Sequence, residues 1–122
     1  MNILINQHSD IPIYEQIKRQ MKQMMIKAEL NEHDKLPSVR ILSKDLQIGI
    51  ITVKRAYDDL VKEELILSIP GKGYYVSKID KDKIQHSYLK EIKILIHKIE
   101  SLKKEADIKD IDLKVLWEKE RG

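Results

Sequence analysis

The stretch "LPSVRILSKDLQIGIITVKRAYDDLVKEELILSIPGKGYYVS", residues 36–77, decides the fold. Ser38 is well placed to cap a helix that runs to about Leu46 and buries Leu42 and Leu46. After a short polar break a second helix begins at Gly49, which is a permissive but weak cap. The stretch therefore opens with two short helices in succession.

The second of these helices has an apolar face and an exposed face. At 100° per residue, Ile51 and Arg55 lie opposite the apolar stripe, and Thr52 and Lys54 flank them. The two adjacent cations beside an outward isoleucine are either simply solvated or part of a surface that contacts a partner. The inward stripe consists of Val53, Ala56, Tyr57 and Leu60.

Beyond the second helix the period of the apolar side chains changes from helical to alternating. Residues 65–69 and 74–77 alternate in the manner of β-strands, and a Pro-Gly-Lys-Gly turn separates them. Gly71 and Gly73 supply turn conformations, and Lys72 lies at the tip. This segment predicts a short hairpin with a basic tip.

A further helix precedes the stretch, from residue 12 to about residue 29. Pro12 suits its first turn, and its apolar residues recur at intervals of three and four: Ile13, Ile17, Met21, Met24 and Ala28. Three helices followed by a basic-tipped hairpin make a winged helix-turn-helix domain, which we place at residues 1–79. The predicted fold class is mainly α (α+β).

The remaining residues, 80–122, predict a helical tail in two pieces. The apolar residues of the first piece form a heptad seam. From Tyr88 to Leu102 the seam is roughly 21 Å long, which is too short for a self-sufficient coiled coil. The apolar faces most economically meet the same faces of a second subunit, although a ligand pocket is the alternative. The predicted dimer interface comprises Tyr88, Ile92, Leu95, Ile99 and Leu102 of the seam, and Leu116 and Trp117 of the last helix.

Positive charge is concentrated in one segment of the chain. Charged residues make up 35% of the sequence, yet the formal net charge is only +3. Between Lys35 and Arg55 there are five cations and one acid, whereas the next ten residues hold four acids and one lysine. Placement of charge, more than its total, therefore favours an anionic partner.

Other classes of function find little support in the sequence. Cysteine is absent, which excludes disulfides and thiolate metal sites and fits a soluble cytoplasmic protein. No apolar run is long enough to span a membrane. The four histidines lack ligand spacing, and no nucleophile and base lie together, so we expect no metal, no cofactor and no catalysis.

Residues 36–77 strongly resemble the DNA-binding domain of the GntR family of bacterial transcription regulators. The features that carry the resemblance are Leu36-Pro37-Ser38 followed by Arg40, then Thr52-Val53 followed by Arg55-Ala56-Tyr57, and the Gly71-Lys72-Gly73 turn. The amino-terminal "PIYEQI" also looks like the first helix of the family. The short tail resembles that of the YtrA-like branch, in which the tail dimerises the protein.

The resemblance implies DNA contacts at the start of each of the two helices and in the wing. Arginine and lysine can neutralise phosphates or donate to guanine, and Thr52 can bond a phosphate oxygen. With the outward residues of the second helix, the predicted DNA-binding set is Ser38, Arg40, Ile51, Thr52, Lys54, Arg55, Gly71, Lys72 and Gly73. The alternatives are that Arg55 pairs with Asp59 four residues on, and that Thr52 is only a local helix cap.

The sequence departs from the pattern of the family at several positions. Gly49 and Ile50 replace a small polar residue followed by Arg or Pro, so a contact often made there is missing. His33 and Glu64 stand where glycines are usual, and we expect His33 at a positive φ. Ile51 can compensate by packing on a thymine methyl group.

The function implied is a homodimeric, sequence-specific transcription regulator that binds a pseudo-palindromic operator in double-stranded DNA. A repressor of a transporter or stress-related operon is the expected form. Two alternatives remain: an effector site at the tail dimer interface that gates DNA binding, and a winged helix that binds protein instead of DNA.

Overall fold

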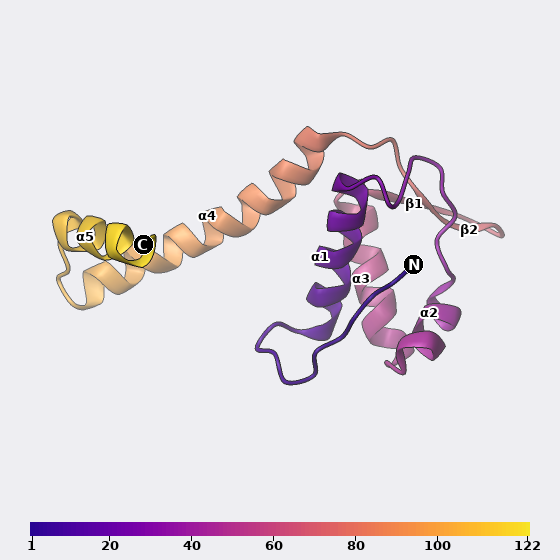
Figure 1. Cartoon of the computed structure of the whole chain (residues 1–122), viewed down its shortest axis with the longest axis horizontal. Coiled ribbons are helices and arrows are strands. Elements are labelled where there is room, and N and C mark those ends of the chain that lie inside the picture. Colours follow the sequence, from indigo (N-terminus) through magenta and orange to yellow (C-terminus); the bar gives the residue numbers. More distant parts are fainter. The chain divides into compact units, whose positions relative to one another are not determined.

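The computed structural model describes all 122 residues as five helices and two strands. The chain divides into two compact units, Met1–Gln85 and His86–Gly122. In chain order the elements are α1 (Ile13–Ile26), α2 (Val39–Leu46), α3 (Ile50–Lys62), β1 (Ile66–Ile69), β2 (Gly73–Val76), α4 (Lys81–Glu105) and α5 (Asp110–Glu120) (Figure 1).

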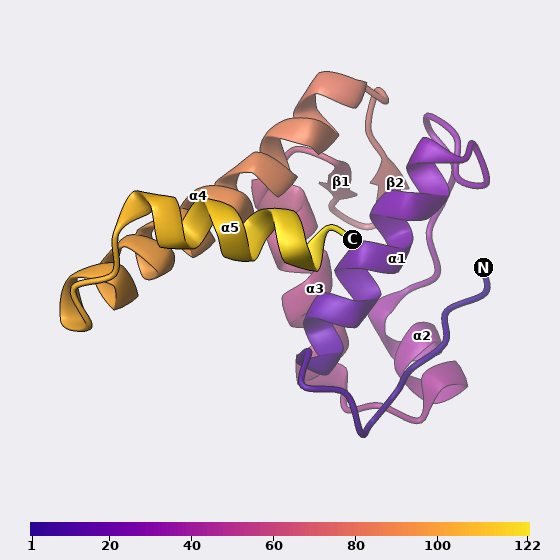
Figure 2. The ribbon, with the colours of Figure 1, turned by 60° about the vertical axis from the view of Figure 1, so that its left-hand side comes forward.

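The core of the first unit lies between α1 and α3, which run side by side in Figures 1 and 2. Ile17 and Met21 of α1 are fully buried. The predicted inward stripe of α3 is confirmed, because Val53, Ala56, Tyr57 and Leu60 are all fully buried. Removal of these two apolar stripes from water stabilises the packing of α1 on α3.

The first helix ends earlier than the sequence predicts. α1 stops at Ile26, and Ala28, expected on its buried face, lies outside the helix at φ 60° and is exposed. The Glu29 amide donates to the Met24 carbonyl at 2.8 Å, and the Ala28 amide donates to the Met25 carbonyl at 3.3 Å. This pair of bonds is a Schellman closure, which turns the chain back and buries Leu30.

Two strands and one loop segment form the wing. β1 and β2 pair antiparallel, with Ile66 opposite Val76 and both fully buried, as the hairpin prediction requires. Residues 33–36 lie along the other edge of β2, where the His33 amide donates to the Val76 carbonyl at 2.8 Å and the Leu36 amide to the Tyr74 carbonyl at 2.9 Å. The wing is therefore tied directly to the residues that precede α2.

The positive φ predicted for His33 is confirmed, and Glu64, for which no conformation was predicted, has one as well. His33 has φ 67° and Glu64 has φ 63°, so both occupy the left-handed region that glycine favours. Leu46 was predicted to be buried, but it is only half-buried because α2 ends there and Gln47 turns the chain at φ 55°.

The second unit contains most of α4 and all of α5. Its apolar side chains are largely exposed: Leu95, Leu102, Leu116 and Trp117 each keep more than half of their surface. Ile99 is half-buried and, with Leu102 and Leu116, lines an apolar groove between α4 and α5. The end of the predicted seam is thus partly covered by α5 of the same chain.

No helix of the protein has both the length and the apolar character needed to cross a bilayer.

Candidate nucleic-acid interface

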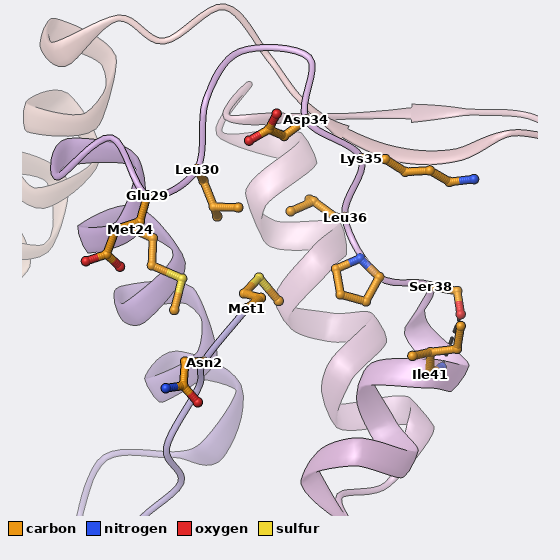
Figure 3. A pocket seen from close by; sticks show the side chains of 11 residues that line it. Met1, Asn2, Met24, Glu29, Leu30, Asp34, Lys35, Leu36, Ser38 and Ile41 are labelled. Atoms are coloured by element: carbon orange, nitrogen blue, oxygen red, sulfur yellow. Dashed lines mark hydrogen bonds between the residues drawn. The ribbon is translucent and has the colours of Figure 1, made fainter.

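Ser38 begins α2 in the predicted way. Its hydroxyl oxygen accepts a hydrogen bond from the Ile41 amide at 3.1 Å, drawn as a dashed line in Figure 3. This cap satisfies one of the free amides of the first turn and fixes where α2 starts. Arg40 follows on that first turn, exposed and without an ion pair, so its guanidinium is free to bind an anion.

The face of α3 that was predicted to point outward is exposed in the structure. Ile51 keeps 85% of its surface exposed and is the most exposed large apolar side chain of the protein. Gly49 caps the helix without a side-chain bond, and Thr52 makes no side-chain hydrogen bond. The alternative that Thr52 serves as a helix cap is therefore wrong, and its hydroxyl is available at the amino-terminal end of α3.

Lys54 on the same face is held by an acid. Its Nζ lies 3.1 Å from Asp58 Oδ2, one turn further along α3, and both side chains are exposed. The hydrogen bond to Asp58 and the charge of that carboxylate raise the pKa of Lys54. Asp58 therefore competes with any phosphate that Lys54 contacts.

Arg55 contacts α1 and does not pair along its own helix. Its Nη2 donates to the Tyr14 hydroxyl at 3.0 Å, and its guanidinium carbon lies 3.7 Å from the centre of the Tyr14 ring. The predicted alternative, an Arg55–Asp59 pair, is wrong because Asp59 accepts from Lys18 instead. Stacking on an aromatic ring limits the rotamers of the arginine while leaving it exposed.

The wing tip adopts the predicted glycine turn with a lysine at its tip. Gly71 and Gly73 have φ values of 75° and 114°, which side chains with a Cβ rarely adopt. The Lys72 amide donates to the Ile69 carbonyl at 3.0 Å, and its side chain is exposed without an ion pair. The turn thus presents one unpaired cation beyond the end of the strands.

Sequence reasoning missed two contributors to this surface. Tyr14 orients Arg55, and the only signal for it was its place in the amino-terminal "PIYEQI". Lys35 was counted among the cations but given no role; its side chain extends clear of the neighbouring labelled residues in Figure 3, and its Cε would lie 3.6 Å from a Cβ placed on Gly73. Lys35 therefore brings a further charge to the wing.

Asp59 of α3 and Glu63, which follows α3, are directed to α1, whereas Asp58 stays on the outward face with Lys54. Lys18 of α1, with its side chain only 9% exposed, lies 3.3 Å from Asp59, 3.5 Å from Glu15 and 3.7 Å from Glu63. The deeply buried Lys22 lies 3.4 Å from Glu63. Burial opposes the charged form of Lys18, but the charges of Glu63, Glu15 and Asp59 outweigh it and raise its pKa. This ion cluster fixes α3 on α1.

A groove of about 610 Å³ lies beside the start of α2 (Figure 3). Leu30 projects toward Leu36 beneath the loop that joins α1 to α2. Leu30 and Leu36 are buried, so they anchor the loop that carries Lys35 and Ser38. The apolar contacts thereby hold the amino-terminal end of α2 next to the wing.

Residues 13–76 match the family described as bacterial regulatory proteins, gntR family. The chain belongs to the GntR family. Its fold, a mainly helical winged helix-turn-helix followed by a short helical tail, is the one predicted. The resemblance to the YtrA-like branch is also confirmed by the relatives that follow.

Two relatives carry the YtrA name. The transcriptional repressor YtrA of Bacillus subtilis is 42% identical over 76 residues, which cover 62% of this chain and 58% of that protein. The structure of YtrA from Sulfolobus acidocaldarius, a GntR-family transcription factor, is 31% identical with a TM-score of 0.64, and the match covers 81% of this chain and 97% of that one. The chain thus matches 58% of the length of the Bacillus subtilis repressor YtrA. It matches 30% of the length of the Bacillus subtilis repressor NagR.

A third neighbour is a complex with nucleic acid. The DNA-binding domain of AraR bound to operator ORX1 is 22% identical, with a TM-score of 0.56, and the match covers 63% of this chain and 96% of that domain. At this identity the likeness concerns the fold alone.

Proposed function

We propose that the protein is a transcription regulator that binds a specific sequence of duplex DNA and represses the genes beside it. The observation that carries this proposal is the cationic surface of the winged helix. Arg40, Arg55 and Lys72 are exposed and unpaired by acids, and they come from α2, α3 and the wing respectively. In this role the protein acts in the cytoplasm, where chromosomal DNA is accessible.

The relatives support both parts of the proposal. The two curated repressors named above share the matched region, and the AraR domain shows that a winged helix of this fold binds an operator. On this reading α3 enters the major groove, where Ile51 packs on a thymine methyl and Thr52 and Lys54 bond phosphates or base edges. Ser38 and Arg40 meet the backbone, and Gly71 to Gly73 let the wing approach the adjacent groove.

We further propose that the protein acts as a homodimer joined by the tail. The exposed apolar residues of α4 and α5 give a second copy a surface to cover, and two recognition helices about 34 Å apart would read half-sites one turn of duplex apart. The contacts we assign to this interface are Tyr88, Ile92, Leu95, Ile99, Leu102, Leu116 and Trp117.

Titration of a fluorescent duplex with the full chain at several salt concentrations tests DNA binding. Arg40→Ala and Lys54→Ala should each weaken binding and reduce the salt dependence of the affinity by about one phosphate contact. Asp58→Asn should strengthen binding, because it releases Lys54 from its ion pair. Lys104→Ala, which removes an exposed lysine of the tail, is the matched control and should leave the affinity unchanged. Equal affinities and equal salt slopes for all four variants would refute the interface.

A further inference from the structure

The first unit has a second groove, and none of its lining residues is among those assigned to DNA. It has a volume of about 560 Å³, in the range of small-molecule sites. Its walls come from the end of α3, from β1, from the residues that follow β2 and from the first turn of α4. The lining residues are His33, Val61, Glu64, Ile66, Leu67, Ser68, Ser77, Lys78 and Lys83.

One polar group in this lining lacks a partner. Ser77 is 7% exposed, and its buried hydroxyl has no hydrogen-bond partner in the protein. A buried hydroxyl without a partner costs free energy, so its presence needs an explanation. The hydroxyl oxygen has almost no accessible surface in this rotamer, so a ligand in the groove reaches it only when the Ser77 side chain turns about χ1; the hydroxyl can then donate to an anionic oxygen, which supplies the missing bond.

The charges of the lining favour an anion. Lys78 is exposed and makes no ion pair, and Lys83 is only loosely paired, with its Nζ 3.7 Å from Glu64. Glu64 is the single acid of the lining and is itself mostly exposed, so water weakens its effect on the two lysines. Val61, Ile66 and Leu67 supply an apolar wall, which a bare inorganic ion would leave uncovered.

We propose that this groove binds a small phosphate monoester. Its phosphate group accepts hydrogen bonds from Ser77 and from the exposed hydroxyl of Ser68, and it pairs with Lys78 and Lys83. Its organic part rests on the apolar wall. A dianionic phosphate suits this set better than a carboxylate, because it offers three oxygens to two ammonium groups and two hydroxyls. None of its residues belongs to the set assigned to the tail interface or to the set assigned to DNA, and the site does not depend on the proposed function.

The test is a titration of the ¹⁵N-labelled full chain with glycerol phosphate, inorganic phosphate and acetate, at matched ionic strength. We expect saturable shifts of the amides of Ser68, Ser77 and Lys78, with glycerol phosphate binding more tightly than inorganic phosphate. Acetate should produce no saturable shift at these residues. Tighter or equal binding of acetate, or of inorganic phosphate, would overturn the assignment to a phosphate monoester.

Substitutions separate this site from the nucleic-acid surface. Ser77→Ala should weaken glycerol phosphate binding about tenfold, the contribution of one hydrogen bond to a charged group. It should not lower the stability of the protein, because it removes a hydroxyl that has no partner. Glu64→Gln should strengthen binding, and Lys72→Gln at the wing tip should leave it unchanged. Full binding by Ser77→Ala and by Lys78→Gln/Lys83→Gln, or shifts confined to α2, α3 and the wing tip, would overturn the proposal.

Discussion

At the scale of single residues, the ends of the helices carry conformational strain. Glu64 follows α3 at φ 63°, with its own amide donating to the Val61 carbonyl at 2.9 Å and the Leu65 amide donating to the Leu60 carbonyl at 2.9 Å. This Schellman closure ordinarily uses glycine, because a Cβ at positive φ is strained. Ala28 and Gln47 close α1 and α2 in the same conformation.

Replacement of Glu64 by glycine should therefore stabilise the protein. We expect the free energy of unfolding to rise by about 1 kcal/mol, since glycine adopts the left-handed conformation without strain. Glu64→Ala is the control: it removes the exposed ion pair with Lys83 but keeps the Cβ, and it should change stability by less than about 0.5 kcal/mol. Urea denaturation measures both, and a loss of stability in Glu64→Gly would contradict this account of α3.

Tyr14 allows a second prediction at this scale. If Arg55 contacts a phosphate, Arg55→Ala should reduce the salt slope of DNA binding by about one unit. Tyr14→Ala should weaken binding while leaving the slope unchanged, because the guanidinium is still present but no longer held in place. Tyr14→Phe keeps the ring and serves as the intermediate case. Wild-type affinity in Tyr14→Ala would show that the stacking has no part in binding.

At the scale of elements, the orientation of α3 depends on the ion cluster between it and α1. Lys18 stands among Glu15, Asp59 and Glu63, and removing its charge leaves three carboxylates close together. Lys18→Met keeps most of the apolar volume and should lower the free energy of unfolding by about 1–3 kcal/mol, less than for a fully buried pair because the carboxylates are partly exposed. Lys27→Met, on an exposed lysine just beyond α1, is the control and should have little effect.

The free energy of unfolding that Lys18→Met loses should depend on pH in one direction. The pKa of Lys18 in the folded protein is raised above its ordinary value of 10.5. Its stabilising contribution is therefore complete below pH 10.5 and is lost as the pH rises through the folded pKa. The difference in stability between the wild type and Lys18→Met should be constant near neutral pH and should shrink above pH 10.5. A difference that grows with alkaline pH would contradict the role of the cluster.

Much of the fold could be predicted because local patterns specify it. The stripe of α3, the Ser38 cap and the Gly71–Gly73 turn each depend on residues close together in the sequence, and all three are confirmed. The pairing of residues 33–36 with β2 was missed, because no periodicity marks an edge formed by tertiary hydrogen bonds.

Side-chain partners at long range were harder to predict. The Tyr14–Arg55 stack and the Lys18–Asp59 pair each join residues 41 positions apart. A count of charges along the chain cannot show which acids are directed to another helix. The early end of α1 was missed for a local reason: an alanine occupies the left-handed position, where glycine would have been the signal.

At the scale of the whole molecule, the homodimer that we propose depends on the tail. If the seam joins two copies, Leu95→Asp with Ile99→Asp should give monomers in analytical ultracentrifugation, because charged side chains would have to be buried at the interface. Ile94→Asp is the matched control: Ile94 is exposed but points away from the seam at 100° per residue, so the dimer should persist. A dimer formed by the double variant would place the interface elsewhere.

Selection of random duplexes by the purified full chain, followed by sequencing, tests the central claim most directly. A dimeric GntR repressor should enrich an inverted repeat whose half-sites lie about one helical turn apart. Ile51→Ala should relax the preference for thymine at one position of each half-site. Failure to enrich any sequence, with only weak binding that disappears at higher salt, would contradict sequence-specific recognition by this winged helix.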